Sequence, residues 1–275
     1  MIGAPVNLAG CEDLAMHVPA QGLVTVDSTG DLVRLLIVLA VLVGQAALVT
    51  RWGGLRLARA QLTAAVRATA QLAVVGSVIA AVLGSWWLTA AFTGLMTTVA
   101  AVTAGRRVAP PPSQAWWWGF LPVCAGAIPV AAVLVGTGVV PFVPIAVVPV
   151  VGILVGGAMT ATSLAGQRVR DALTARYGEV EAALALGFRE REARLLVARD
   201  DAGLALVPGL DQTRTVGLVT LPGTFVGMLL GGATPLAAAA VQLVVLLALL
   251  LVATLATVLT TELCARGIFG HPAQP

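Results

Sequence analysis

The sequence predicts an all-α protein, a polytopic bundle of about seven membrane-spanning helices. Of its 275 residues, 59% are apolar and 11% are charged, whereas about a quarter of a soluble domain is charged. Apolar runs of the roughly 20 residues that a helix needs to cross a bilayer recur along the chain. These runs are continuous and do not alternate like the strands of a membrane barrel, so helices are expected.

The expected spans divide the chain into a transmembrane domain and two tails. The spans cover residues 32–50, 68–85, 87–104, 115–136, 143–165, 215–231 and 237–261. The transmembrane domain runs over 32–262, after an acidic tail at 1–31 and before a second tail at 263–275. A long connection at 167–214 joins the fifth span to the sixth.

The distribution of positive charge predicts the orientation. All 16 basic residues are arginines, and every one except Arg34 follows the first, third, fifth or seventh span. Positively charged connections stay in the cytoplasm, which places the N-terminal tail outside, the C-terminal tail in the cytoplasm and an odd number of spans between them. We therefore expect a multi-pass protein of the plasma membrane, which in bacteria is the inner membrane.

The composition argues against catalysis by this chain. A P-loop ATPase requires the lysine of its GxxxxGK[ST] motif, and the sequence has no lysine. Its two histidines, His17 and His271, lie in the tails, away from the predicted bundle. We expect no catalytic residue, no cofactor on this chain and no nucleic-acid partner, and we assign no metal ligand. The predicted span centres carry no ionisable residue, so the energy for uphill transport would enter from outside the membrane.

Charge is concentrated in the connection between the fifth and sixth spans. Residues 167–201 hold 14 of the 29 charged side chains. Glu179 and Glu181 begin a short helix, where carboxylates interact favourably with exposed N–H groups, and Gly187 ends it. A second helix, roughly 189–206, returns to the membrane. The sequence predicts a rigid cytoplasmic hairpin that another protein could push, although an amphipathic loop resting on lipid headgroups is an alternative.

Several segments resemble a known family. Glu181-Ala182-Ala183, three residues and Gly187 resemble the EAA-xxx-G coupling motif of bacterial ABC-transporter permeases. Residues 142–159, 199–200 and 206–235, together with Arg67 and Gln71, are similar to the FetB-type iron-export ABC permeases, a family with plant aluminium-tolerance relatives. Two departures are the glycine Gly157, where the family has an amide, and Arg214, where it has a lysine.

The resemblance implies a permease that works with a separate cytoplasmic P-loop ATPase, which would bind ATP and Mg²⁺. The assembly would contain a homodimer of permeases and would export iron or another metal, free or complexed. The residues expected to couple the permease to the ATPase are Glu181, Ala182, Ala183, Gly187, Arg199 and Asp200. Alternatives are an ABC permease for an organic anion or nucleotide sugar and, more distantly, a stand-alone channel or membrane scaffold.

Further candidates are polar or soft side chains near the predicted spans. An ion pair or gate could involve Arg67, Asp211 and Arg214, and Asp211 and Arg214 are spaced to share a helix face. The candidate pathway residues are Gln71, Met159, Thr160, Ser163, Thr220, Thr224, Met228 and Gln242. Each of these could instead face a neighbouring helix.

Overall fold

The computed structural model describes residues 28–109 and 113–270, and within these ranges the chain is helical with no strand. Six of its helical segments are long and apolar enough to cross a membrane. The predicted all-α class is confirmed, and the chain is a multi-pass membrane protein. The orientation of the termini stays a prediction, and residues 1–27 of the predicted N-terminal tail lie outside the described residues.

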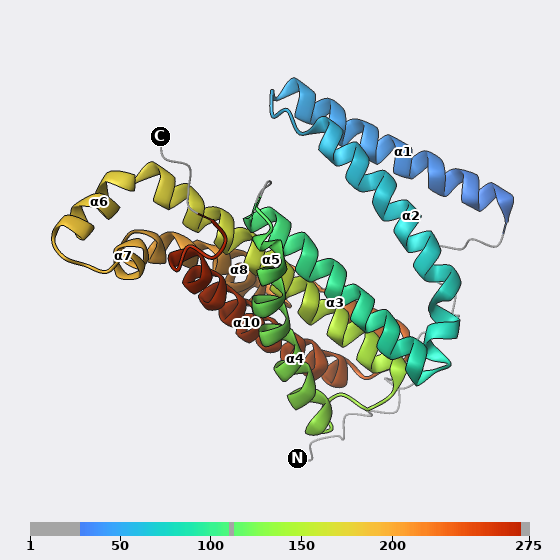
Figure 1. Cartoon of the computed structure of the whole chain (residues 1–275). Coiled ribbons are helices and arrows are strands. Elements are labelled where there is room, and N and C mark those ends of the chain that lie inside the picture. Colours follow the sequence, from blue (N-terminus) through green and yellow to red (C-terminus); the bar gives the residue numbers. More distant parts are fainter. Residues whose placement is uncertain (1–27, 110–112, 271–275) are drawn as a thin grey trace, which may run out of the picture. The chain divides into compact units, whose positions relative to one another are not determined.

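The chain forms two compact units, Met1–Ser77 and Val78–Pro275. The first unit contains α1 (Thr29–Trp52) and most of α2 (Ala58–Leu83), and these two helices run antiparallel (Figure 1). The Ser28 hydroxyl caps α1 by accepting from the N–H of Asp31, and Thr50 Oγ1 donates to Gln61 Oε1 at 2.8 Å. Both helices expose nearly all of their apolar side chains, as helices facing lipid or another subunit do.

The core of the second unit is built from four long segments. These are α3 (Trp86–Val108), η2 with α4 (Ala115–Gly119 and Phe120–Gly136), α5 (Pro144–Ala175) and α10 (Pro235–Ala265). Small residues let these backbones approach closely, which is the usual means of packing helices in membranes. A Cβ added at Gly105 of α3 would lie 1.8 Å from the carbonyl oxygen of Trp116, so only glycine fits there.

The helices α5 and α10 extend beyond the spans that the sequence predicts. They contain 32 and 31 residues, respectively. At 1.5 Å per residue each is roughly 46–48 Å long, whereas the apolar layer of a bilayer is about 30 Å thick. The helix α5 therefore continues beyond the predicted end of the span at residue 165, through Arg168 and Arg170. Likewise, α10 continues past residue 262 into the predicted C-terminal tail.

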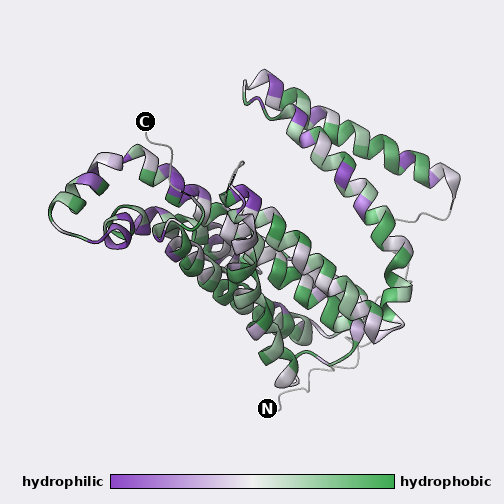
Figure 2. Ribbon diagram, in the orientation of Figure 1, coloured by the Kyte–Doolittle hydropathy of each residue, from purple (hydrophilic) through white to green (hydrophobic). Residues whose placement is uncertain are grey.

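A helical hairpin follows α5, as predicted, and many of its residues are hydrophilic (Figure 2). It consists of α6 (Tyr177–Ala185) and α7 (Glu190–Gly203), and the short η3 (Leu204–Leu206) leads into α8 (Val207–Thr215). We refer to α6 and α7 together as the α6–α7 hairpin. Its apolar side chains pack with the ends of α3, α5 and α10 in a second core cluster that includes Val169, Leu173, Val180, Val197 and Leu263.

The predicted sixth span, 215–231, is not a continuous helix. The helix α8 ends at Thr215, residues 216–222 form a turn, and α9 (Gly223–Leu230) has only eight residues. Gly217 has φ +82°, a left-handed conformation that favours glycine, and Pro222 lacks the N–H that a helix would need. An eight-residue helix is about 12 Å long and cannot cross the membrane alone. We call α8, the turn and α9 the α8–α9 segment.

Candidate functional site

The end of α6 is fixed by a glycine in the left-handed conformation. Gly187 has φ +89°, and its N–H donates to the carbonyl of Leu184 at 2.9 Å. The N–H of Phe188 donates to the carbonyl of Ala183 at 3.1 Å. These two bonds are those of a Schellman motif, which satisfies the last carbonyls of a helix and reverses the chain. A Cβ at Gly187 would touch nothing within 4 Å, so the requirement for glycine comes from its backbone conformation.

The tip of the hairpin exposes apolar side chains. Leu186 is 80% exposed, and Leu184 and Phe188 are also exposed. Of the three residues of the resembling motif, Glu181 and Ala182 face solvent, whereas Ala183 is buried. Exposed apolar side chains beside charged ones are typical of a protein-docking surface. We define the hairpin tip as Glu181, Ala182, Leu184, Leu186 and Phe188.

Arginine side chains bond the base of the hairpin to the ends of α5 and α10. Arg176, at the end of α5, bonds to the Asp201 carboxylate and to the carbonyl of Val197. The guanidinium of Arg191 donates twice to Glu262 of α10, at 2.6 and 2.7 Å, and this carboxylate raises the pKa of Arg191 above its ordinary value. Bidentate pairs of this kind fix geometry as well as distance.

Further contacts join the hairpin to α10. The buried Arg194 of α7 donates to the carbonyl of Ala265 at 3.2 Å. Arg266, which follows the last residue of α10, donates to Glu262 at 2.6 Å and so helps to orient the carboxylate that Arg191 contacts. Through these contacts, with the Arg176 contacts at the end of α5 and the shared apolar cluster, the hairpin is joined to both α5 and α10.

Arg199 and Asp200 do not lie at the hairpin tip. They are on α7, about two and a half turns beyond its start, and both are exposed. Arg199 lines a cavity against α10 with Thr257 and Glu262. The sequence grouped these residues with Glu181 and Gly187, but the structure separates the two sets.

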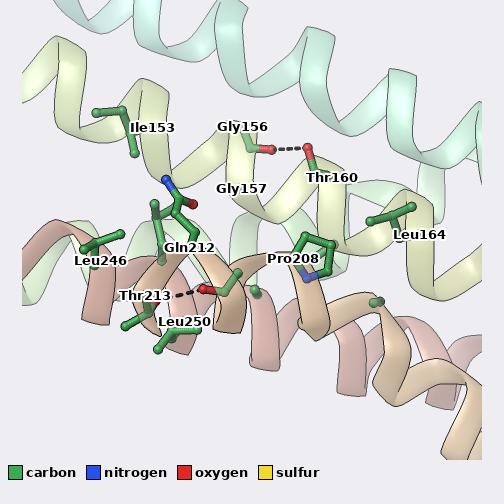
Figure 3. Close-up of a pocket in the computed structure, with 15 residues that line it drawn as sticks. Ile153, Gly156, Gly157, Thr160, Leu164, Pro208, Gln212, Thr213, Leu246 and Leu250 are labelled. Carbon is green, nitrogen blue, oxygen red and sulfur yellow. Dashed lines mark hydrogen bonds between the residues drawn. The ribbon is translucent and has the colours of Figure 1, made fainter. Parts of the chain in front are cut away.

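A cavity of about 300 Å³ lies between α5, α8 and α10 (Figure 3). Most of its lining is apolar, and its polar side chains are Thr160, Gln212 and Thr213. Figure 3 shows the Gln212 amide extending from α8 toward α5. Gly156 faces open space, since a Cβ there would meet nothing within 4 Å. A Cβ at the neighbouring Gly157 would lie 2.6 Å from Leu249 Cδ2, so an amide at this position would require that leucine to move.

A second cavity of about 360 Å³ lies between α10 and the turn of the α8–α9 segment. The two cavities share Leu246, so they follow one another along α10. Gln242 lines the second cavity, is only 4% exposed and leaves its Oε1 without a hydrogen-bond partner. An unpaired buried carbonyl is costly, and it can be satisfied by a ligand that donates a hydrogen bond.

The structure places the other predicted residues in several environments. Thr160 and Gln242 line the two cavities, whereas Ser163 is buried and donates to the carbonyl of Met159 at 2.8 Å. Met159 packs against the core. The remaining candidates of the second unit line neither cavity, and they are Thr220, Thr224 and Met228.

The predicted ion pair of α8 is present but weakly held. Arg214 Nη1 lies 3.6 Å from Asp211 Oδ1, and both side chains are exposed. Arg67 and Gln71 lie on α2 in the first unit and are exposed. Within residues 28–109 and 113–270, no group of three or more His, Cys, Asp or Glu side chains could hold a metal ion.

The profile of the "Uncharacterised protein family (UPF0014)" matches residues 33–269. The chain belongs to the UPF0014 family. It is 35% identical over 211 residues to the UPF0014 membrane protein STAR2 of Oryza sativa subsp. japonica, covering 76% of this chain and 73% of that protein. It is also 35% identical over 211 residues to the Protein ALUMINUM SENSITIVE 3 of Arabidopsis thaliana. That match covers 76% of this chain and 77% of the Arabidopsis protein.

The name of one bacterial relative states a function. The chain is 32% identical over 155 residues to the "Probable iron export permease protein FetB" of Escherichia coli (strain K12), covering 56% of this chain and 60% of that protein. No solved structure matches the chain. The resemblance predicted from the sequence is confirmed at the level of the family, and the family profile, over residues 33–269, spans the hairpin and both cavities.

The sequence did not predict Gln212 as a site residue of this UPF0014 protein. Gln212 lies within the segment 206–235 that carries the resemblance, next to the charged Asp211. Gln212 lies on α8, which packs beside α5 and α10 at the first cavity, and a sequence alone does not distinguish a polar residue between helices from one in a surface loop.

Proposed function

We propose that this chain is the permease subunit of an ABC exporter, which moves iron or another metal, free or complexed, out of the cytoplasm. ATP would be hydrolysed by a separate subunit. The name of the Escherichia coli relative, an iron export permease, supports the cargo and the direction of transport. The observation that carries the proposal is the α6–α7 hairpin, whose tip is exposed and apolar while its base is bonded to α5 and α10.

In this proposal the hairpin transmits force from the ATPase. Closure of an ATPase pair presses on the hairpin tip, and the Arg191–Glu262 and Arg194–Ala265 contacts carry the displacement to α10. The Arg176–Asp201 pair carries it to α5. Because α8 and α9 bury no residue, they do not follow rigidly, and the two cavities change shape. The transporter then switches between two discrete arrangements, as domain-scale transitions generally do.

The cavity linings support a cargo that brings its own ligands. Gln212, Thr160 and Gln242 offer amide and hydroxyl groups, and neither cavity is lined by an ionisable side chain. Neutral oxygen atoms hold a cation less strongly than carboxylates do, so a hydrated or chelated ion fits these linings better than a bare one. Gln242 Oε1 would accept a hydrogen bond from a water or ligand molecule on that ion.

The test is a pull-down of the tagged protein from its native membranes, probed for a bound P-loop ATPase. The wild type should retain the ATPase, and Gly187→Val should lose it, because a β-branched residue strains the left-handed conformation by about 1–3 kcal/mol. Gly187→Asn is the matched control, since asparagine tolerates this conformation and should keep the ATPase.

A second variant separates charge from backbone conformation. Glu181→Arg reverses a charge on the hairpin tip without altering the turn, and it should also weaken retention of the ATPase. If no ATPase accompanies the wild type, or if all three variants retain it equally, the chain does not work as proposed.

A further inference from the structure

A third cavity, of about 270 Å³, lies where the charged hairpin meets the apolar length of α10. Its polar lining comes from Arg191 and Arg199 of α7 and from Thr257 and Glu262 of α10. Leu206 and Val258 are among its apolar lining residues. The cavity is separate from the hairpin tip and shares no lining residue with the two cavities described above.

The charge of this cavity is positive. Its two guanidinium groups face one carboxylate, and Glu262 is already bonded to Arg191 and to Arg266. Arg199 makes no hydrogen bond or ion pair with any other described residue. A free guanidinium at the edge of a cavity is suited to an anion, especially to a phosphate, which it can bind through two parallel hydrogen bonds.

A buried hydroxyl points to a ligand independently of the charges. Thr257 is 4% exposed, and its Oγ1 has no hydrogen-bond partner. Other threonines of the same helix, Thr254, Thr260 and Thr261, each donate to the carbonyl four residues earlier. Thr257 lines the cavity but does not make this bond, so its hydroxyl is left unpaired.

An apolar stripe continues from the cavity along the membrane-spanning part of α10. Its exposed apolar side chains are spaced four or seven residues apart, so they lie on one helix face, and they are Leu243, Leu247, Leu251 and Val258. A small soluble anion has no apolar part that could contact this stripe. A phospholipid with its headgroup in the cavity could place an acyl chain along it.

We propose that this cavity binds the headgroup of an anionic phospholipid, with Arg199 and Arg191 facing the phosphate, Thr257 hydrogen-bonded to it and an acyl chain along the α10 stripe. Basic pockets at the membrane boundary of helical bundles are suited to anionic lipids, and arginines on the cytoplasmic side would meet the leaflet that is rich in them. The lipid would connect α7 with α10 at the base of the hairpin. This proposal does not depend on the identity of the cargo.

The test uses the purified full chain in detergent, and native mass spectrometry counts the phospholipids that it retains. Phosphatidylglycerol should be retained in preference to phosphatidylcholine. Arg199→Gln should reduce the affinity for phosphatidylglycerol by about fivefold, the effect of one arginine near an anionic surface. The matched control is Arg168→Gln, which removes the same charge from an exposed position of α5 outside the cavity and should retain the lipid.

Thr257→Val provides a second test, which compares the thermal midpoint of unfolding with and without lipid. The two midpoints distinguish a lipid-binding role of the Thr257 hydroxyl from a role in packing alone. Without lipid this variant should have a higher thermal midpoint than the wild type, since it removes an unpaired buried hydroxyl. It should nevertheless gain less stabilisation from added phosphatidylglycerol. A smaller gain together with a lower midpoint would indicate simple damage to packing and would contradict the role of the hydroxyl.

A competition experiment distinguishes a lipid from a soluble phosphate. Excess glycerol phosphate should leave phosphatidylglycerol bound, because it lacks the acyl chain that contacts α10. Displacement of the lipid by glycerol phosphate would show a site for free phosphates and would overturn the proposal. Equal loss of lipid in Arg199→Gln and Arg168→Gln would also overturn it, since binding would then reflect overall charge.

Discussion

The α6–α7 hairpin and the α8–α9 segment are neighbours in the sequence, yet the first is packed tightly against the rest of the protein and the second only loosely. The hairpin buries side chains of both its helices, including Val180, Ala183 and Val197, and it is bonded to α5 and α10 through arginines. The α8–α9 segment buries no residue of either helix and is interrupted at residues 216–222.

This difference in packing indicates which helices move together when the hairpin is displaced. A force on the hairpin reaches α5 and α10 directly, because packing and hydrogen bonds join them. The α8–α9 segment makes looser contact with the same helices and lines both intramembrane cavities. Elements with few buried contacts open at lower free-energy cost, so this segment is the part that we expect to shift relative to the rest.

The largest expected effect comes from filling the first cavity, which lies between α8 and the helices α5 and α10. Gly156→Leu places a side chain in open space within the first cavity, so the protein should fold normally while iron efflux from cells is abolished. Gly156→Ala adds only a methyl group and should leave most of the efflux intact. Normal efflux by the leucine variant would show that the cargo does not pass through this cavity.

Two glycine substitutions should show that α5 is tightly packed and that α9 is not. A Cβ at Gly166 of α5 would lie 2.3 Å from a methyl group of Val108, so Gly166→Ala should lower the free energy of unfolding by about 1–3 kcal/mol. Gly227→Ala in α9 meets nothing within 4 Å and should stabilise by up to about 1 kcal/mol, because alanine favours helices. Similar losses in both variants, measured by denaturant titration in detergent, would mean that α9 is as tightly packed as α5.

Replacing the buried amide of the second cavity should raise the stability of the fold but reduce transport. Gln242→Leu removes a carbonyl oxygen that has no partner, so unfolding should cost about 1 kcal/mol more than in the wild type. Iron efflux should fall nevertheless, because the cargo loses its hydrogen-bond acceptor. A more stable variant with unchanged efflux would remove Gln242 from the transport path.

The smallest effect is expected at the base of the hairpin. Glu262→Gln weakens the bonds to Arg191 and Arg266, and partly exposed pairs of this kind contribute about 1 kcal/mol or less. Amide exchange in α7 should become faster while α8 is unaffected. Asp211→Asn disrupts the exposed pair with Arg214 and is the control, for which no change in α7 is expected.

The sequence predicts those features that depend on composition and local chemistry. Continuous apolar runs predict the long helices, and the glycine at position 187 after an Ala/Leu helix predicts the end of α6. The interruption at 216–222 is missed, because an apolar run looks like a span whether or not its backbone stays helical. Gly217 and Pro222 signal the interruption, but glycine and proline are also frequent within membrane helices.

The site is predicted less completely because it depends on which helix faces which. Thr160 and Gln242, two of the candidate pathway residues, line the first and second cavities, whereas Gln212 is not among the candidates. Arg199 is grouped with the hairpin tip because the two lie in one charged segment. Its actual neighbour, Thr257, is far away in the sequence and comes from the end of α10.

The central claim is that the hairpin moves with α10 and that the α8–α9 segment does not. Distances between pairs of nitroxide labels, measured by electron paramagnetic resonance, test it most directly in a variant without Cys11, Cys124 and Cys264. One pair joins Leu196 of α7 to Leu218 of the turn, and the other joins Leu196 to Leu251 of α10; all three positions are exposed. With the ATPase bound, addition of ATP should change the first distance and leave the second unchanged. A change in the second distance, or none in the first while cargo is exported, would contradict the account.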